Sequence, residues 1–138
     1  MRYLDQILSQ IFSSWGYDEI ATPTIEHLET LVSRIQEEND LFILSGNKNR
    51  LLALRNEMTT PIARLVSSRL KDLPVPLKLS YIGNVFRIEQ TQEGRQCEFH
   101  QAGVELMGCH TAAADAEIIA LAIEAVLACG IKEFQIHI

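Results

Sequence analysis

The sequence has no long apolar run, few basic residues and few cysteines, and each shortage argues against a class of protein. None of its apolar stretches reaches the length of a membrane-spanning helix, and the first residues lack the apolar core of a signal peptide. Lys and Arg number 12 against 18 Asp and Glu, and the net charge of −6 argues against binding to a nucleic-acid backbone. The 3 cysteines follow no disulfide framework and indicate reduced thiols. We therefore expect a cytoplasmic protein with no membrane or nucleic-acid partner.

The residues that are present are those of one globular domain. A chain of 138 residues, 47% of them hydrophobic, can bury one core. Its 7 glycines and 4 prolines are ordinary in number, and the chain contains no repeat or low-complexity tract. Helical and strand periodicities both occur along it. We predict an α+β domain over residues 1–138, in which helices flank an antiparallel β-sheet.

Turn and cap residues divide this domain into elements. Gly16 follows a helical pattern where a C-cap glycine belongs, and Thr60 before Pro61 is typical of a helix start. A helix from Asp115 to about Cys129 is apolar on most sides, so we expect it to be largely buried. The other predicted helices cover residues 3–15 and 28–35, and the predicted strands cover 41–44, 50–54, 77–89, 97–107 and 134–138.

The most informative segment is the predicted hairpin over residues 80–108, whose loop covers residues 91–96. Strand alternation places Gln101, Gly103 and Glu105 on one face, and Arg87 extends from the first strand. A glycine inside a strand often marks the close approach of a ligand or of another backbone. An arginine and two hydrogen-bonding groups around such a glycine indicate a site for a small zwitterion or a phosphate ester.

This hairpin also resembles a known sequence motif. It is similar to motif 2 of class II aminoacyl-tRNA synthetases, and specifically to histidyl-tRNA synthetase and to a relative of it, the regulatory subunit of ATP phosphoribosyltransferase. The latter acts in the first step of histidine biosynthesis. The residues that carry the resemblance are Phe86 to Glu89, Gly94 and Arg95, Glu98 to Gln101, and Gly103 to Gly108.

The resemblance extends over nearly the whole chain. Residues of about 12–32 look like the motif 1 region, residues of about 52–60 like the amino-acid-binding loop, and residues of about 77–108 like motif 2. The family therefore implies a class II catalytic-domain-like fold, of which this chain is the N-terminal portion. It also implies a homodimer built through the motif 1 region.

Three features of the sequence bear on the choice between the two families. Met58 and the run Pro61–Ser68 are typical of the regulatory family, and Gln90 stands where synthetases carry an arginine. Asn56 departs from both families, which have proline there, and this puts the rigidity of the loop in question. Met58, the run Pro61–Ser68 and Gln90 favour the regulatory family.

The resemblance implies a role for each residue of a histidine site. Glu57, Thr59 and Gln101 would accept hydrogen bonds from the α-ammonium group of bound histidine. Glu105 would accept from the imidazole, and Arg87 would bind the carboxylate, or the α-phosphate of an adenylate in a synthetase.

Two further residues, Glu89 and Arg95, would line the nucleotide side in a synthetase and be vestigial in a regulatory subunit. The resemblance implies no catalytic residue, no metal and no cofactor in a regulatory subunit, with histidine as the effector.

Ordinary structural roles remain open for the same residues. Arg87 and Glu89 could form a surface ion pair, Glu57 could be a solvated loop residue or a cap, and Gln101 and Glu105 could lie on an exposed sheet face. Arg64 and Arg69 are expected to be solvated, with a contact to a partner as the alternative. Zinc is also disfavoured for the set Cys97, His100, Cys109 and His110. Strand alternation points Cys97 and His100 to opposite faces, and Cys109–His110 lacks a metal-ligand spacing.

The resemblance leads to one preferred function and two alternatives. We expect a non-catalytic regulatory subunit that pairs with the short catalytic subunit of ATP phosphoribosyltransferase and mediates feedback by histidine. One alternative is a fragment of histidyl-tRNA synthetase, which activates histidine with ATP and charges tRNA. The other is a free-standing histidine-binding module. On family grounds a synthetase would need segments beyond residue 138.

Overall fold

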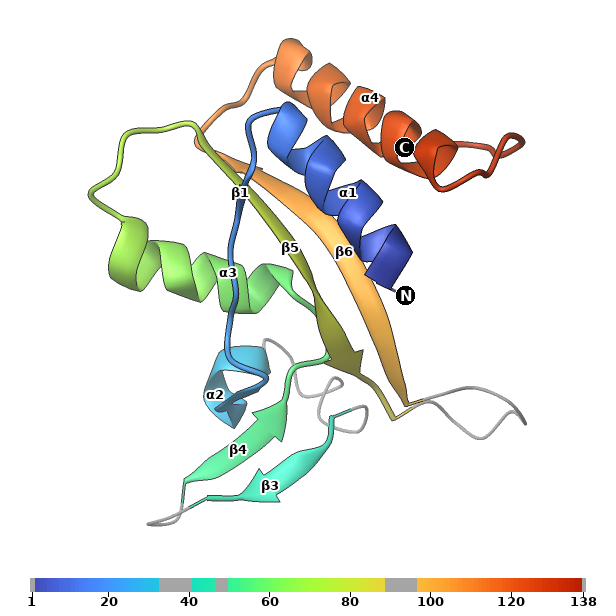
Figure 1. Cartoon of the computed structure of the whole chain (residues 1–138). Coiled ribbons are helices and arrows are strands. Elements are labelled where there is room, and N and C mark those ends of the chain that lie inside the picture. The colour runs from blue at the N-terminus through green and yellow to red at the C-terminus, as the bar shows by residue number, and fades with distance from the viewer. Residues whose placement is uncertain (1, 33–40, 47–49, 89–96, 138) are drawn as a thin grey trace. The chain divides into compact units, whose positions relative to one another are not determined.

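The computed structural model describes residues 2–32, 41–46, 50–88 and 97–137 (Figure 1). The chain divides into two compact units. The first contains residues 1–20, 74–82 and 102–138, and the second contains residues 21–73 and 83–101. The long strands β5 (Leu77–Phe86) and β6 (Glu98–Met107) each contribute to both units.

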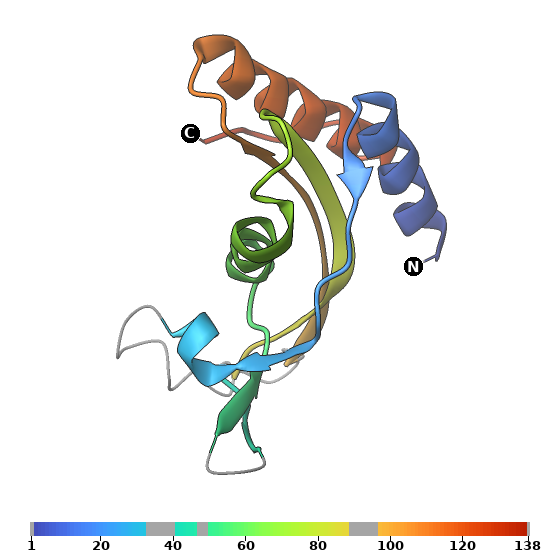
Figure 2. The same ribbon diagram turned by 90° about the vertical axis from the view of Figure 1, so that its left-hand side faces the viewer.

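The first unit is a sheet covered on one face by two helices. Helix α1 (Arg2–Ser14) and helix α4 (Ala112–Ala128) lie side by side, on the same side of the sheet (Figure 2). The sheet has the order β1-β5-β6, and the two-residue strand β1 (Asp18–Glu19) runs parallel to β5. The buried core consists of Phe12, Tyr17, Leu121 and Ala125, against which Ile82, Ala102, Val104 and Leu106 pack.

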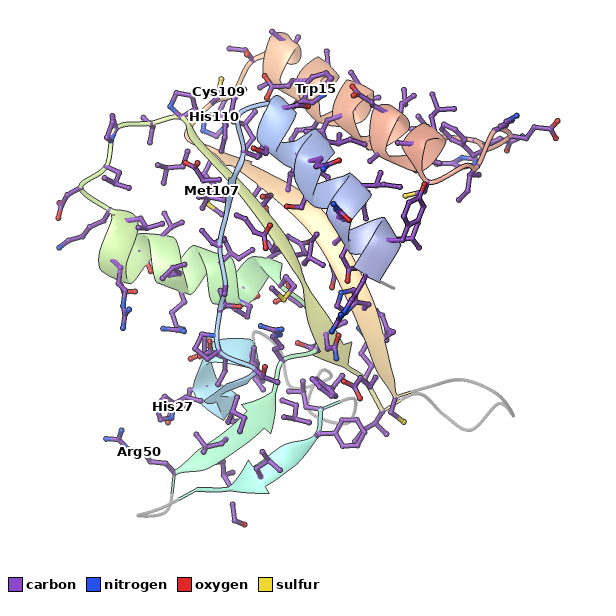
Figure 3. All side chains as sticks on the ribbon, in the orientation of Figure 1. Trp15, His27, Arg50, Met107, Cys109 and His110 are labelled. Atoms are coloured by element: carbon purple, nitrogen blue, oxygen red, sulfur yellow. The ribbon has the colours of Figure 1, made fainter. Side chains whose placement is uncertain are left out.

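The second unit contains a small antiparallel sheet with the order β2-β4-β3. Its strands are β2 (Ile25–His27), β3 (Ile43–Ser45) and β4 (Leu51–Leu54), and its helices are α2 (Leu28–Leu31) and α3 (Thr59–Leu65), the latter continued by a π-helical turn, Val66–Leu70. The core under this sheet consists of Leu28, Leu31, Leu41 and Ala53. Figure 3 shows His27 on this sheet and Arg50 beside it.

Several predicted boundaries are confirmed and others are wrong. Gly16 follows α1 with φ +81°, as expected of a C-cap glycine, and the hairpin around residues 45–50 is present. Helix α3 begins at Thr59 rather than after a Thr60 cap, because the Glu57 carboxylate already accepts a hydrogen bond from the Thr60 backbone nitrogen. The parallel pairing of β1 with β5 was not predicted.

The prediction for the last helix was partly wrong. Helix α4 begins after Thr111, whose hydroxyl oxygen accepts a hydrogen bond from the Ala114 backbone nitrogen (3.2 Å), so Asp115 lies inside the first turn. Only one side of α4 is buried, through Ala114, Leu121 and Ala125, whereas Leu127 is 49% exposed. Gly130 ends the helix with φ +91°, as predicted.

The strand predicted over residues 134–138 is absent from its described part. Apolar alternation alone does not make a strand without a pairing partner, and residues 131–137 pair with none of the described strands. Phe134 and Ile136 are partly exposed. Residues 33–35 of the second predicted helix, the loop over 91–96 and Ile138 lie outside the described residues. None of the described helices is both long and apolar enough to cross a membrane.

Candidate functional site

The predicted amino-acid-binding loop lies between strand β4 and helix α3, in the second unit. Glu57 is half-buried, and its Oε1 atom accepts a hydrogen bond of 2.9 Å from the Thr60 backbone nitrogen. Thr59 is exposed as the first residue of α3, and Met58 between the two is 1% exposed. The loop is therefore anchored by an apolar side chain and by a capped helix start. The expected alternative role of Glu57 as a cap is confirmed.

Arg87 reaches this loop from the end of strand β5. Its Nε atom donates to the backbone oxygen of Asn56 at 2.8 Å, and its guanidinium carbon lies 5.1 Å from the centre of the Phe99 ring. The Arg87 backbone nitrogen also donates to the Cys97 oxygen at 2.8 Å, which continues the pairing of the two long strands. The structure thus connects two segments that the sequence assigned to one site, although Arg87 and Asn56 are 31 residues apart.

The other predicted residues lie on strand β6. Gln101 is half-buried and is the last residue of the second unit, while Glu105 belongs to the first unit and is half-buried there. Glu89 and Arg95, predicted for the nucleotide side, lie outside the described residues. Four of the predicted residues therefore lie in the second unit, namely Glu57, Thr59, Arg87 and Gln101. A hydrogen bond joins Arg87 to the loop.

Gly103 allows a close approach, as the sequence suggested. The group that approaches it is a side chain of the same sheet rather than a ligand or another backbone. A Cβ atom built on Gly103 would lie 2.5 Å from the hydroxyl oxygen of Tyr81 and 2.6 Å from its Cζ atom. Tyr81 comes from β5 and is 5% exposed. The absence of a side chain at Gly103 therefore makes room for the tyrosine ring.

Sequence reasoning missed Arg55, whose side chain and backbone both make hydrogen bonds within the second unit. Its side chain donates to the backbone oxygens of Thr22 and Asn84, and it is only 6% exposed. Burial lowers the pKa of Arg55, and the charge of the nearby Glu26 carboxylate acts in the opposite direction. The sequence indicated only that a positively charged residue directly follows the apolar strand Leu51–Leu54.

Arg64 also differs from its expectation. It was expected to be solvated, but its Nη2 atom lies 2.6 Å from Oε1 of Glu26, whose side chain is only 5% exposed. Glu26 comes from β2, in the motif 1 region. A buried carboxylate needs a cationic partner, and Arg64 supplies one.

The zinc-like residues do not gather in the described part of the chain. Cys109 and His110 lie together between β6 and α4 in the first unit (Figure 3), whereas Cys97 and His100 belong to the second. His100 Nδ1 instead contacts the side-chain oxygen of Asn84. Among the described residues, no three His, Cys, Asp or Glu side chains are grouped as metal ligands would be.

Comparison with known proteins shows the family to which the chain belongs. A family model described as histidyl-tRNA synthetase matches residues 1–138. The chain belongs to the histidyl-tRNA synthetase family. Within it, the predicted resemblance to ATP phosphoribosyltransferase regulatory subunits is confirmed. The curated protein of that name from Desulforamulus reducens is 46% identical over 138 residues, which are 100% of this chain and 34% of the relative.

The regulatory subunit from Moorella thermoacetica is 48% identical over 138 residues, which are 99% of this chain and 36% of that protein. The chain thus spans about a third of the length of the curated relatives that it matches.

Solved structures confirm the class II synthetase-like fold. A crystal structure described as an ATP phosphoribosyltransferase regulatory subunit/histidyl-tRNA synthetase from Bacillus halodurans matches with a TM-score of 0.87 and 43% identity, over 97% of this chain and 35% of that one. Histidyl-tRNA synthetase from S. aureus matches with a TM-score of 0.79 and 27% identity, over 95% of this chain and 31% of that one. The predicted α+β fold with antiparallel strands and flanking helices is therefore confirmed.

Proposed function

We propose that this chain is part of a non-catalytic regulatory subunit of ATP phosphoribosyltransferase, and that it binds histidine as a feedback effector. The observation that carries the proposal is its similarity to curated relatives of that name, at 46% and 48% identity over nearly the whole chain. The identity to the solved histidyl-tRNA synthetase from S. aureus is much lower, at 27%. The regulatory role is therefore favoured over aminoacylation.

The proposed effector site keeps the residues that the family resemblance implies. Glu57, Thr59 and Gln101 accept hydrogen bonds from the α-ammonium group of histidine, Arg87 binds its carboxylate, and Glu105 accepts from its imidazole. Two observations support the loop as a binding element: its residue Met58 is buried, and Arg87 is hydrogen-bonded to its backbone at Asn56. The resemblance further implies that Glu89 and Arg95 are vestigial residues of a nucleotide side.

Reconstitution with the partner tests the regulatory role. The protein encoded by the complete gene is mixed with the short catalytic subunit of ATP phosphoribosyltransferase, and turnover of ATP and phosphoribosyl pyrophosphate is followed. We expect a complex with raised turnover, which added L-histidine lowers by reciprocal coupling between the two sites. An unchanged rate together with separate elution of the two proteins would reject the regulatory role.

The motif 1 resemblance adds a proposed homodimer. Light scattering on the same protein, without the catalytic subunit, is expected to give twice the mass of one chain. A mass of one chain at micromolar concentration would reject this part of the proposal without affecting the effector site.

Aminoacylation is the second candidate, because the matching family model is described as histidyl-tRNA synthetase and a solved synthetase superposes on the chain. Its test is histidine-dependent exchange of pyrophosphate into ATP by the protein from the complete gene. Exchange above the protein-free background would favour the synthetase. We expect none.

A further inference from the structure

We propose that Arg55 is the positioning residue of the amino-acid-binding loop, and that it acts through a reciprocal pair of arginine–carbonyl hydrogen bonds between the loop and strand β5. The importance of this loop for histidine rests on the proposed function. The positioning itself rests on contacts within the second unit, all of them between described residues.

The Arg55 side chain joins two segments that are distant in sequence. Its Nε atom donates to the Asn84 backbone oxygen at 2.8 Å, on β5. Its Nη1 atom donates to the backbone oxygen of Thr22 at 2.7 Å and to the Thr22 hydroxyl at 3.1 Å, and it lies 3.5 Å from the Pro23 oxygen. Several donors on one planar group reach several acceptors at once, which a lysine ammonium cannot reproduce with the same geometry.

The main chain of Arg55 binds the same two segments. Its nitrogen donates to the Thr24 oxygen at 3.0 Å, and its oxygen accepts from the Phe86 nitrogen at 2.9 Å. Residue 55 is therefore held by side chain and backbone between the segment 22–24 and the end of β5. Because β4 ends at Leu54 and Arg55 is the first residue after it, these bonds set the position at which the loop leaves the strand.

The reciprocal contact comes from Arg87. Arg55 Nε donates to Asn84 on the strand, and Arg87 Nε, from just beyond that strand, donates to Asn56 in the loop, each at 2.8 Å. Each segment thus supplies an arginine to a backbone carbonyl of the other. The two contacts fix the spacing between the loop and the Arg87 guanidinium.

Gly83 allows this arrangement by leaving space for the Arg55 guanidinium. A Cβ atom built on Gly83 would lie 2.7 Å from Arg55 Nη2 and 3.6 Å from Cζ, closer than side chains pack without a shift. A methyl group at position 83 would therefore displace the guanidinium, although it touches no predicted ligand residue. Binding sites require their groups to be held within about 0.5 Å, so such a displacement is expected to reach Glu57 and Thr59.

The charge of Arg55 is balanced inside the same unit. Glu26, 5% exposed, attracts Arg55 electrostatically and also pairs with Arg64. A buried guanidinium without hydrogen bonds and a counter-charge would be unfavourable. The charge of Arg55 is thus compensated by Glu26, and the hydrogen bonds of Arg55 give the loop one defined position.

The test uses the protein encoded by the complete gene and two readouts. The first is the exchange with water of the arginine Nε protons, observed by nitrogen-15 NMR, and the second is calorimetric titration with L-histidine. The variants are Arg55→Lys and Gly83→Ala, and the control is Arg50→Lys, because Arg50 is exposed. In the wild type we expect the Nε protons of Arg55 and Arg87 to exchange more than about tenfold slower than that of Arg50.

Both variants are expected to lose the protection of the Arg87 proton, although neither alters Arg87, and to weaken histidine binding by about tenfold or more. The control is expected to change neither. Rapid exchange of the Arg55 Nε proton in the wild type would overturn the proposal, as would unchanged Arg87 protection in either variant that keeps a dispersed spectrum. If the wild type binds no histidine, the effector role fails, and the exchange data still decide the positioning.

Discussion

The Glu57 carboxylate lies 2.9 Å from the backbone nitrogen of Thr60, and it therefore satisfies one of the free N–H groups at the start of α3. The same carboxylate is the proposed acceptor for the α-ammonium group of histidine. One oxygen of a carboxylate can accept at the helix start while the other accepts from a ligand. The two roles are compatible, and substitutions can separate them.

Glu57→Gln and Glu57→Ala are expected to differ from each other in stability and to weaken histidine binding to the same extent. The glutamine keeps an oxygen that can accept from Thr60, so its free energy of unfolding should stay within about 0.5 kcal/mol of the wild type. The alanine removes the acceptor and is expected to cost about 1 kcal/mol. Both remove the negative charge that binds the ammonium group, so both should weaken histidine binding by about tenfold. Urea unfolding and calorimetry measure the two quantities.

Unchanged histidine affinity in both variants, beside a wild type that binds, would remove Glu57 from the site and leave it only the capping role. Glu29→Gln is a suitable control, because Glu29 is exposed in the first turn of another helix, α2.

Arg87→Lys tests the contact between the loop and β5. The lysine keeps the positive charge but loses the Nε donor that binds Asn56 and the planar group over Phe99. We expect histidine affinity to fall by about tenfold or more, since a hydrogen bond to a charged group contributes about 1.5–3 kcal/mol. Calorimetry measures this, and Arg69→Lys, at an exposed position, is the matched control. Equal affinities of the two variants would contradict the prediction.

The sequence predicted the long hairpin and most helices because their signals are periodic and local. Leu77, Leu79 and Tyr81 alternate along a ten-residue strand, and all three are buried as expected. Strand β1, by contrast, has only two residues and therefore no period, so its parallel pairing with β5 could not be predicted.

Helix starts were less predictable, because a cap can come from several nearby side chains. Thr60 and Asp115 have typical capping chemistry, yet Glu57 and Thr111 supply the observed hydrogen bonds. The hydrogen-bonding role of Arg55 could not be predicted for another reason. Its partners are backbone oxygens of Thr22 and Asn84, 33 and 29 residues away, and backbone acceptors leave no trace in residue types.

The contact between Arg64 and Glu26 should contribute more to stability than an ordinary surface ion pair. Removing the cation in Arg64→Met leaves a carboxylate that is 5% exposed without its 2.6 Å partner. We expect a loss of about 1–3 kcal/mol in the free energy of unfolding, the cost of leaving a buried group unsatisfied. Arg69→Met, five residues further along at an exposed position, is expected to stay within about 0.5 kcal/mol. Urea unfolding of the two variants at neutral pH measures the difference, and equal midpoints and slopes would contradict it.

In the first unit, Glu117 on α4 receives two hydrogen bonds on the same oxygen. Lys78 Nζ lies 2.7 Å from Oε1, and the Tyr17 hydroxyl donates to it at 2.8 Å. The Lys78 ammonium group also lies 5.3 Å from the centre of the Tyr17 ring. These contacts join α4 to β5 and to the segment after α1. The hydrogen bond from Lys78, followed by that from Tyr17, lowers the pKa of Glu117 below its ordinary value of 4.5, and burial raises the pKa of Tyr17.

The lowered pKa of Glu117 makes stability depend on pH in one direction. The unfolded chain binds this proton more readily than the folded one, so the contribution of Glu117 is fully present above pH 4.5 and is lost as the pH falls through the folded pKa. We expect Glu117→Gln to be less stable than the wild type at pH 7, and the difference between the two to shrink as the pH is lowered from 5 to 3. Thermal melts across this range measure it, with Glu133→Gln as the control, because Glu133 is exposed. A difference between wild type and Glu117→Gln that stays constant from pH 7 to pH 3 would show that the contacts of Glu117 do not depend on its charge.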